Sequence, residues 1–281
     1  DGNLEEFNVT SADAETTISG TPKGFTVTLY APEGEVITAF DMTGQRLTTI
    51  DVTKATELRS LVLDNCNLPI INLAYNRCLT SLNLNNNTLS ALDLEGARGD
   101  YDKHVLKRIE AKNNKITDFN IISTRVARYI DLSNNLLAEY DLTNYDNLEH
   151  LDLSGNKLSS VSIAYLSNAR NVNLSGNNLT EIENVIEMPL CETFNVSNNN
   201  LTLETLPYFT AGEPASYVYA PQSTLVIPTK APSINLSKQN RVIDGRGTSY
   251  TWKTVDGRTL AEGTDYRITN DGVTRFLNTN V

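Results

Sequence analysis

The sequence predicts a mainly β protein built as a solenoid of about eight coils, and two observations support this fold class. First, a pattern of the form LxxLxLxxNxL recurs along the chain at nearly constant spacing. Second, the fourth and sixth positions of each copy are apolar, with a polar residue between them in all copies but the one at residue 58, as in a short strand with one buried face. One such strand cannot bury its apolar face alone, so neighbouring coils must stack.

The copies keep their register over most of the chain. Seven begin at residues 58, 79, 106, 127, 148, 169 and 191, and a degenerate copy, "ITAFDMTGQRL", begins at residue 37. Successive starts are 21, 21, 27, 21, 21, 21 and 22 residues apart. The pattern therefore predicts one strand per coil, with a single long interval between residues 79 and 106.

The ninth position of the pattern predicts a structural ladder. It is asparagine in six copies, where the chain must turn inward: Asn87, Asn114, Asn135, Asn156, Asn177 and Asn199. A buried amide repeated in register is tolerable only if it bonds to the backbone of adjacent coils. We therefore expect a stacked asparagine ladder, which Gln45 and Cys66 weaken or modify at its N-terminal end.

A second alternation follows each copy and predicts a second extended segment in every coil. Its apolar pairs are Ile50/Val52, Ile71/Leu73, Leu92/Leu94, Phe119/Ile121, Tyr140/Leu142 and Val161/Ile163. With extended backbone on both sides, we expect a slim, weakly curved solenoid.

The repeat resembles the leucine-rich-repeat family, over roughly residues 37–210, and within it the nested 21-residue subclass of secreted bacterial proteins. That resemblance implies a binding or adhesion protein, exported to the cell surface or the extracellular space. The chain opens on Asp1 rather than Met, which fits a removed leader and an anchored lipoprotein.

The two ends differ from the repeats. Residues 1–36 contain the alternating stretch "GFTVTLY" and are expected to form an N-terminal β-hairpin cap. Residues 211–281 are expected to form a proline-containing linker and a small β module, incomplete in this chain, with hairpin turns at Asp256-Gly257 and Asp271-Gly272. An immunoglobulin-like arrangement around Trp252 is one interpretation of this module.

Composition and side-chain inventory exclude several functions. A net charge of −11 disfavours nucleic acid and anionic membranes as partners, and no apolar run is long enough to cross a bilayer. The three cysteines, Cys66, Cys78 and Cys191, are too scattered for a disulfide framework and are expected to be buried thiols. His104 and His150 are the only histidines and fall in different coils, so we expect no enzyme activity, metal or cofactor.

The exposed positions of the first strand predict a binding surface. Their central part is basic and aromatic, and the candidate ligand-binding residues are Lys107, Arg108, Arg128, Tyr129, His150 and Arg170. Clusters of arginine and aromatic side chains suit contacts with another protein, from a host or a neighbouring cell, or with a glycan. Glycan binding through Tyr129 or the connector tyrosines Tyr75, Tyr145 and Tyr165, and a spacer that presents a C-terminal module, stay open as alternatives.

The long interval holds the tripeptide Arg98-Gly99-Asp100. The connector between Leu94 and Leu106 has 11 residues, against five in a normal coil, and it lies just before the basic coils. Arg-Gly-Asp is the peptide that integrins recognise, but so short a motif also arises by chance. An adhesive loop and a helical turn with charges matching its dipole are both compatible with this stretch.

Overall fold

The structure, a computed structural model, describes most of the chain. The described residues are 34–97, 106–120, 126–142, 145–209, 212–223, 233–239, 242–243, 246–254, 256–270 and 272–277. The chain divides into two compact units, Asp1–Ile37 and Thr38–Val281. The expected N-terminal cap therefore lies outside the described residues except for its last three, and it stays a prediction.

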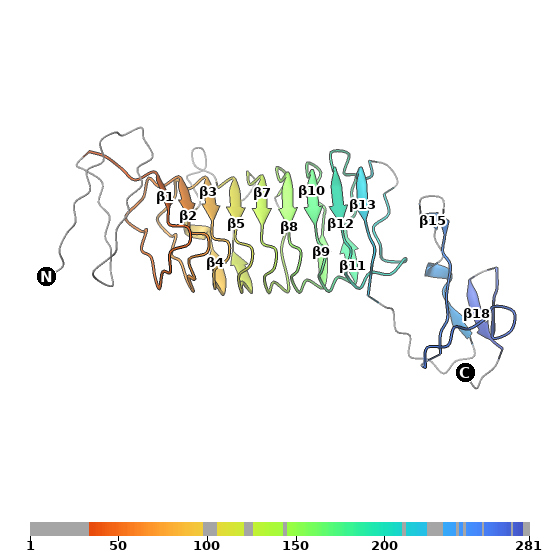
Figure 1. The fold of residues 1–281 in the computed structure, drawn as a ribbon. Helices are drawn as coiled ribbons and strands as arrows, with labels where there is room; N and C mark the ends of the chain where they lie inside the picture. Colours follow the sequence, from red (N-terminus) through yellow and green to blue (C-terminus); the bar gives the residue numbers. More distant parts are fainter. Residues whose placement is uncertain are drawn as a thin grey trace. The chain divides into compact units, whose positions relative to one another are not determined.

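A parallel sheet of nine strands forms one side of the solenoid, with the strands side by side in chain order (Figure 1). Its strands are β1 (Ala39–Asp41), β2 (Ser60–Val62), β3 (Ser81–Asn83), β5 (Arg108–Glu110), β7 (Tyr129–Asp131), β8 (His150–Asp152), β10 (Asn171–Asn173), β12 (Thr193–Asn195) and β13 (Ser216–Val218). The predicted fold class, a mainly β solenoid of about eight coils, is confirmed.

The register of the sheet follows from the apolar fourth position of the repeat. Leu82 pairs with Ile109, Ile109 with Ile130, and Ile130 with Leu151, and each of these central residues is buried. The residues on either side of them point away from the core. Because side chains alternate between the two faces of a strand, a shift by one residue would expose this apolar row.

The ninth-position asparagines lie in the core and bond to the backbone of two coils. In Asn135, for example, Nδ2 donates to the carbonyl oxygens of Ala111 at 3.0 Å and Leu132 at 2.9 Å, and Oδ1 accepts from the Ile116 N–H at 3.0 Å. The amide thus gives the Ile116 N–H its partner and shares each carbonyl with the ladder amide of a neighbouring coil, Asn114 or Asn156. The same bonding recurs at the other ladder positions, Asn87, Asn114, Asn156, Asn177 and Asn199.

The residue before each ladder asparagine adopts a left-handed backbone conformation. Asn134 has a φ of 55°, and Gly155 and Gly176 occupy the same position with a φ of 67°. Asparagine and glycine are the residues that tolerate this conformation best, which explains why the ladder reads as "NN" or "GN" in the sequence.

The ladder ends differently at its two termini. Cys66 takes the asparagine slot in the second coil, where its Sγ donates to the Met42 carbonyl at 3.0 Å. At the other end, Gln222 Oε1 accepts from the N–H groups of Asn199 and Leu201, both at 3.2 Å, and Nε2 donates to the Val196 carbonyl at 2.8 Å. The ladder therefore continues to residue 222.

Strand β13 was not predicted from the repeat pattern. It pairs with β12 and carries the sheet past residue 210, where the regular repeat ends. Aromatic rings cover the core at this point: the Tyr217 ring lies 5.7 Å from both Phe194 and Phe209. These rings shield the apolar edge of the last regular coil, as the end of a solenoid requires.

The second extended segments pair only in part. Strand β4 (Ala91–Asp93) pairs with β6 (Asp118–Asn120), and β9 (Ser160–Ser162) pairs with β11 (Glu181–Glu183). A short 3-10 helix, η1 (Glu95–Ala97), follows β4. Residues 139–142 lie between the two pairs along the chain and are assigned to no strand.

The C-terminal part of the chain holds a small β module. Strands β14 (Ser233–Asn235), β18 (Val273–Phe276) and β17 (Tyr266–Ile268) form an antiparallel sheet in that order. The remaining elements are η2 (Ser237–Gln239), β15 (Val242–Ile243) and β16 (Arg246–Gly247).

Both hairpins expected in this module are present. Strands β17 and β18 pair antiparallel on either side of Gly272, and Lys253 pairs with Thr259 on either side of Gly257. Trp252 packs edge-on against Phe276, with ring centroids 5.1 Å apart. The immunoglobulin-like arrangement and the division of the chain into three domains stay predictions.

Candidate functional site

Four residues at the third position of the repeat form one continuous row across strands β5, β7, β8 and β10. We call Arg108, Tyr129, His150 and Asn171 the central row, and the register of the sheet pairs each with the next. The Arg108 guanidinium carbon lies 3.8 Å from the centroid of the Tyr129 ring, and the Tyr129 and His150 rings are 5.7 Å apart. Asn171 Nδ2 lies 3.1 Å from His150 Nδ1, so the amide donates to the imidazole.

Tyr129 is half-buried at the centre of this row. Burial is the main cause that raises the pKa of its hydroxyl, and Asp131 adds to the effect while Arg108 opposes it. The hydroxyl is therefore a neutral hydrogen-bonding group at physiological pH. A half-buried tyrosine with a polar tip is well suited to a protein contact.

The cations of the predicted face are mostly paired with carboxylates. Arg128 lies 2.5 Å from Glu149, Arg170 lies 3.5 Å from Glu192, and Arg108 contacts Glu110 in its own strand. Lys107 is exposed and enters no ion pair among the described residues. The face is thus of mixed charge rather than basic, and pairs this exposed each contribute only about 0–1 kcal/mol to stability.

The structure brings all six candidate residues to one side of the solenoid, in two adjacent rows. Arg108, Tyr129 and His150 belong to the central row. The second row holds Lys107, Arg128 and Arg170, which come directly before the first residues of β5, β7 and β10. A hollow of about 270 Å³ lies beside this face, lined by Arg128, Asn147, Glu149, Asn168, Arg170 and Leu190.

The pairing of these arginines with glutamates was not predicted from the sequence. Glu149 follows Arg128 by 21 residues, and Glu192 follows Arg170 by 22, so each pair falls at the same repeat position in adjacent coils. The sequence did hold a signal for these ion pairs, namely opposite charges separated by one repeat. Residues in register on adjacent parallel strands are neighbours, so such charges lie close together.

Two aspartates in neighbouring strands of the same sheet, Asp131 and Asp152, have a structural role. Asp131 is buried, and its Oδ1 accepts from the N–H of Ser133 at 3.0 Å and from the hydroxyl of Ser133 at 2.6 Å. Asp152 bonds to Ser154 in the same way. Within the described part of the chain, no group of three or more histidine, cysteine, aspartate or glutamate side chains could hold a metal ion.

Two further predictions concern the Arg-Gly-Asp tripeptide and the connector tyrosines. Arg98, Gly99 and Asp100 lie outside the described residues, so the adhesive-loop hypothesis stays a prediction. Tyr145 is buried and its hydroxyl lies 3.0 Å from that of Tyr140, whereas Tyr75 and Tyr165 are exposed in separate coils.

The stacked parallel strands, the buried asparagine ladder and the repeat define the class of fold: this chain has the leucine-rich-repeat solenoid fold. A family model described as Leucine Rich Repeat matches residues 147–169. A search of curated protein sequences found no match.

Two solved structures from Listeria monocytogenes are similar in fold. One is the functional domain of InlJ, which includes a cysteine ladder: 18% identity over 73% of this chain and 42% of that one, with a TM-score of 0.58. The other is the internalin InlF from strain 4b F2365: 18% identity over 66% of this chain and 54% of that one, with a TM-score of 0.52. The chain thus spans about half the length of these proteins, and at this identity the likeness concerns the fold.

None of the helices in the described part of the chain is long and apolar enough to span a membrane.

Proposed function

We propose that this chain is a non-enzymatic binding protein that recognises another protein through the face carrying the central row. The leucine-rich-repeat solenoid is typical of protein-binding and adhesion proteins such as internalins, and this supports the general class. The observation that carries the assignment to this face is the contact series from Arg108 through Tyr129 and His150 to Asn171. Its side chains are held in place by neighbouring strands, so little conformational freedom is lost when a partner binds.

The state of the cysteines supports a non-catalytic role. The three are buried and free of disulfides. Burial raises the pKa of the Cys66 thiol, and it raises that of Cys191 to about 11. The thiols of Cys66 and Cys191 are therefore protonated at neutral pH, whereas a nucleophilic cysteine acts as its thiolate.

The proposal extends to location and source. We propose that the protein acts outside the cell or at its surface and that its origin is bacterial. The repeat class and the likeness in fold to Listeria internalins support this assignment.

Glycan binding through the connector tyrosines is disfavoured because of Tyr145. Its ring is buried and its hydroxyl is engaged by Tyr140, so it is not presented to a sugar. The exposed tyrosines Tyr75 and Tyr165 belong to coils far apart in the sequence.

A charge-reversal experiment tests the proposal. The full chain, immobilised, is used to capture a protein from a cell-surface extract, and the captured protein is then purified for measurement of its Kd. The triple variant Lys107→Glu, Arg108→Glu and Arg128→Glu should weaken that Kd by at least about a hundredfold, because it removes the three cations and places two of the new carboxylates beside Glu110 and Glu149.

A matched triple variant keeps the test specific. Lys54→Glu, Lys115→Glu and Lys157→Glu change the net charge equally at exposed positions outside the strands. This control should change the Kd by less than about threefold. Equal effects of the two variants, or no effect of the first, would contradict the proposal.

A further inference from the structure

The second side of the coils presents a surface that the proposed function does not use. Its outward-facing residues include seven exposed carboxylates: Asp51, Asp93, Asp118, Glu139, Asp141, Glu181 and Glu183. No lysine or arginine occupies the outward positions of these segments in the described part of the chain. This side is therefore acidic, in contrast to the mixed charge around the central row.

The strand pairing on this side is interrupted at its middle. Strand β6 pairs with β4 and β9 pairs with β11, but residues 139–142 pair with neither in the described structure. The Phe119 and Tyr140 rings stack with centroids 5.8 Å apart and planes inclined by 22°. The stacked rings thus lie where the strand pairing is interrupted.

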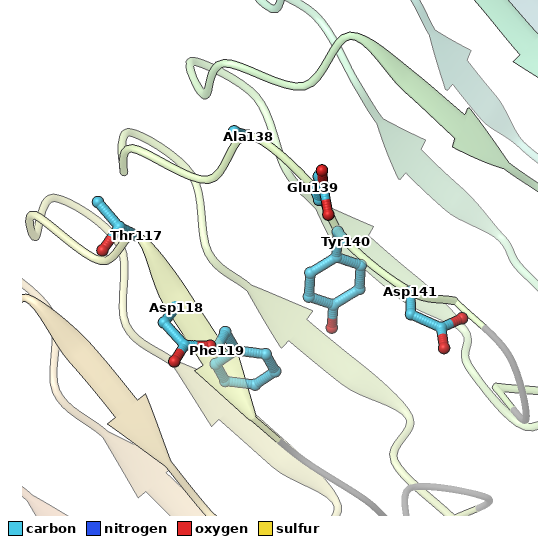
Figure 2. Close-up of a pocket in the computed structure, with 7 residues that line it drawn as sticks. All are labelled: Thr117, Asp118, Phe119, Ala138, Glu139, Tyr140 and Asp141. Atoms are coloured by element: carbon cyan, nitrogen blue, oxygen red, sulfur yellow. The ribbon is translucent and has the colours of Figure 1, made fainter.

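A hollow of about 300 Å³ opens between these segments. Figure 2 shows the rings of Phe119 and Tyr140 next to each other, with Thr117 and Asp118 on one segment and Ala138, Glu139 and Asp141 on the other. Both rings are half-buried, whereas Asp118 and Glu139 are exposed. The hollow thus combines aromatic surface with an acidic rim.

Such a surface matches a long basic side chain. The methylene stem of arginine packs on apolar surface while its guanidinium stays at a polar rim, and its planar fork pairs well with carboxylates. The same chain already packs an arginine against an aromatic ring, at Arg108 and Tyr129.

We propose that this hollow is a second docking site, which accepts an arginine side chain from a basic segment of a partner protein. The complementary charge comes from Asp118 and Glu139, and the apolar contact comes from Phe119 and Tyr140. None of these residues belongs to the central row, so the site is independent of the proposed function.

The test uses a fluorescent penta-arginine peptide and its penta-citrulline counterpart, which has nearly the same shape but no charge. Binding to the full chain is measured by fluorescence anisotropy at low ionic strength, where exposed charges are least screened. The double variant Asp118→Asn and Glu139→Gln should weaken peptide binding by at least about fivefold.

Two matched controls separate the hollow from general attraction to an acidic protein. Glu181→Gln with Glu183→Gln removes the same charge from the same side of the coils, and it should weaken binding by less than about twofold. Ala138→Trp should fill the hollow and weaken binding without changing charge, whereas Ser159→Trp, at the same repeat position one coil later, should not.

Several results would overturn the proposal: penta-citrulline binding as well as penta-arginine, equal losses in the two double variants, equal effects of the two tryptophan variants, or no binding of either peptide. Loss confined to the hollow variants would support it.

Discussion

The guanidinium of Arg108 lies over the ring of Tyr129, 3.8 Å from its centroid, and the two residues are direct partners in strands β5 and β7. The contact joins two coils whose starts are 21 residues apart in sequence. It begins the central row, and because the strands fix its geometry, the row is formed before any partner arrives.

The first prediction concerns the energy of this contact. In a double-mutant cycle, Arg108→Met and Tyr129→Leu should show a coupling of about 0.5–1 kcal/mol in the free energy of unfolding by urea, as expected of an exposed cation–π pair. Arg59→Met, in an earlier coil, should show no coupling to Tyr129→Leu. A coupling near zero in both cycles would mean that the Arg108–Tyr129 contact does not stabilise the face.

The second prediction concerns the ladder. Asn135→Ala would leave the buried N–H of Ile116 without its partner, whereas the carbonyls of Ala111 and Leu132 would keep their bonds from Asn114 and Asn156. An unsatisfied buried group costs about 1–3 kcal/mol, so the variant should lose about 1–3 kcal/mol in urea unfolding. Asn178→Ala, at an exposed position, should lose less than about 0.5 kcal/mol. Similar losses in both would show that the ladder is not a special source of stability.

The third prediction concerns the C-terminal end of the ladder. Gln222→Ala removes the acceptor of the Asn199 and Leu201 N–H groups, so these two amides should exchange with deuterium faster. Gln45→Ala, at the other end, should leave exchange in its coil unchanged, because the Gln45 side chain is exposed. Unchanged exchange in Gln222→Ala would exclude Gln222 from the ladder.

The fourth prediction concerns alkaline pH. Burial, with a smaller effect of Tyr145, raises the pKa of the Tyr140 hydroxyl well above its ordinary value of 10.0. Its neutral form is favoured by the fold, so the stabilisation is complete below the unfolded pKa of about 10 and is lost as pH rises through the higher folded pKa. In Tyr140→Phe, Tm should fall less steeply above pH 10 than in the wild type. Parallel Tm curves would contradict this assignment.

The repeat made most of the solenoid predictable, because one period determines both the strands and the ladder. Residues such as Leu82 and Ile109 could be placed in the core from spacing alone, and both are buried. The left-handed turn before each ladder residue was encoded as well, in the asparagine or glycine that precedes it.

Strand β13 could not be predicted in the same way. Ser216–Val218 lacks the repeat pattern, and it joins the sheet because Tyr217 packs against Phe194 and because Gln222 continues the ladder. These are tertiary contacts that no local spacing reveals. Residues 139–142 illustrate the converse. They carry the expected alternation, but they form no strand at the place where the Phe119 and Tyr140 rings stack.

The predicted binding face was located by the repeat, but its charge was not. Register placed Arg128 and Arg170 on one side of the solenoid, whereas their pairing with Glu149 and Glu192 depends on side-chain conformations as well as position. The proposed surface is consequently better described by its row of rings and amides than by a basic patch.

The most direct test of the proposed function is hydrogen–deuterium exchange of the chain, free and bound to its captured partner. The account predicts that protection on binding concentrates in the peptides that contain β5, β7, β8 and β10, with β9 and β11 unchanged. Protection confined to β9, β11 or the C-terminal module would contradict the claim that the central row is the binding face.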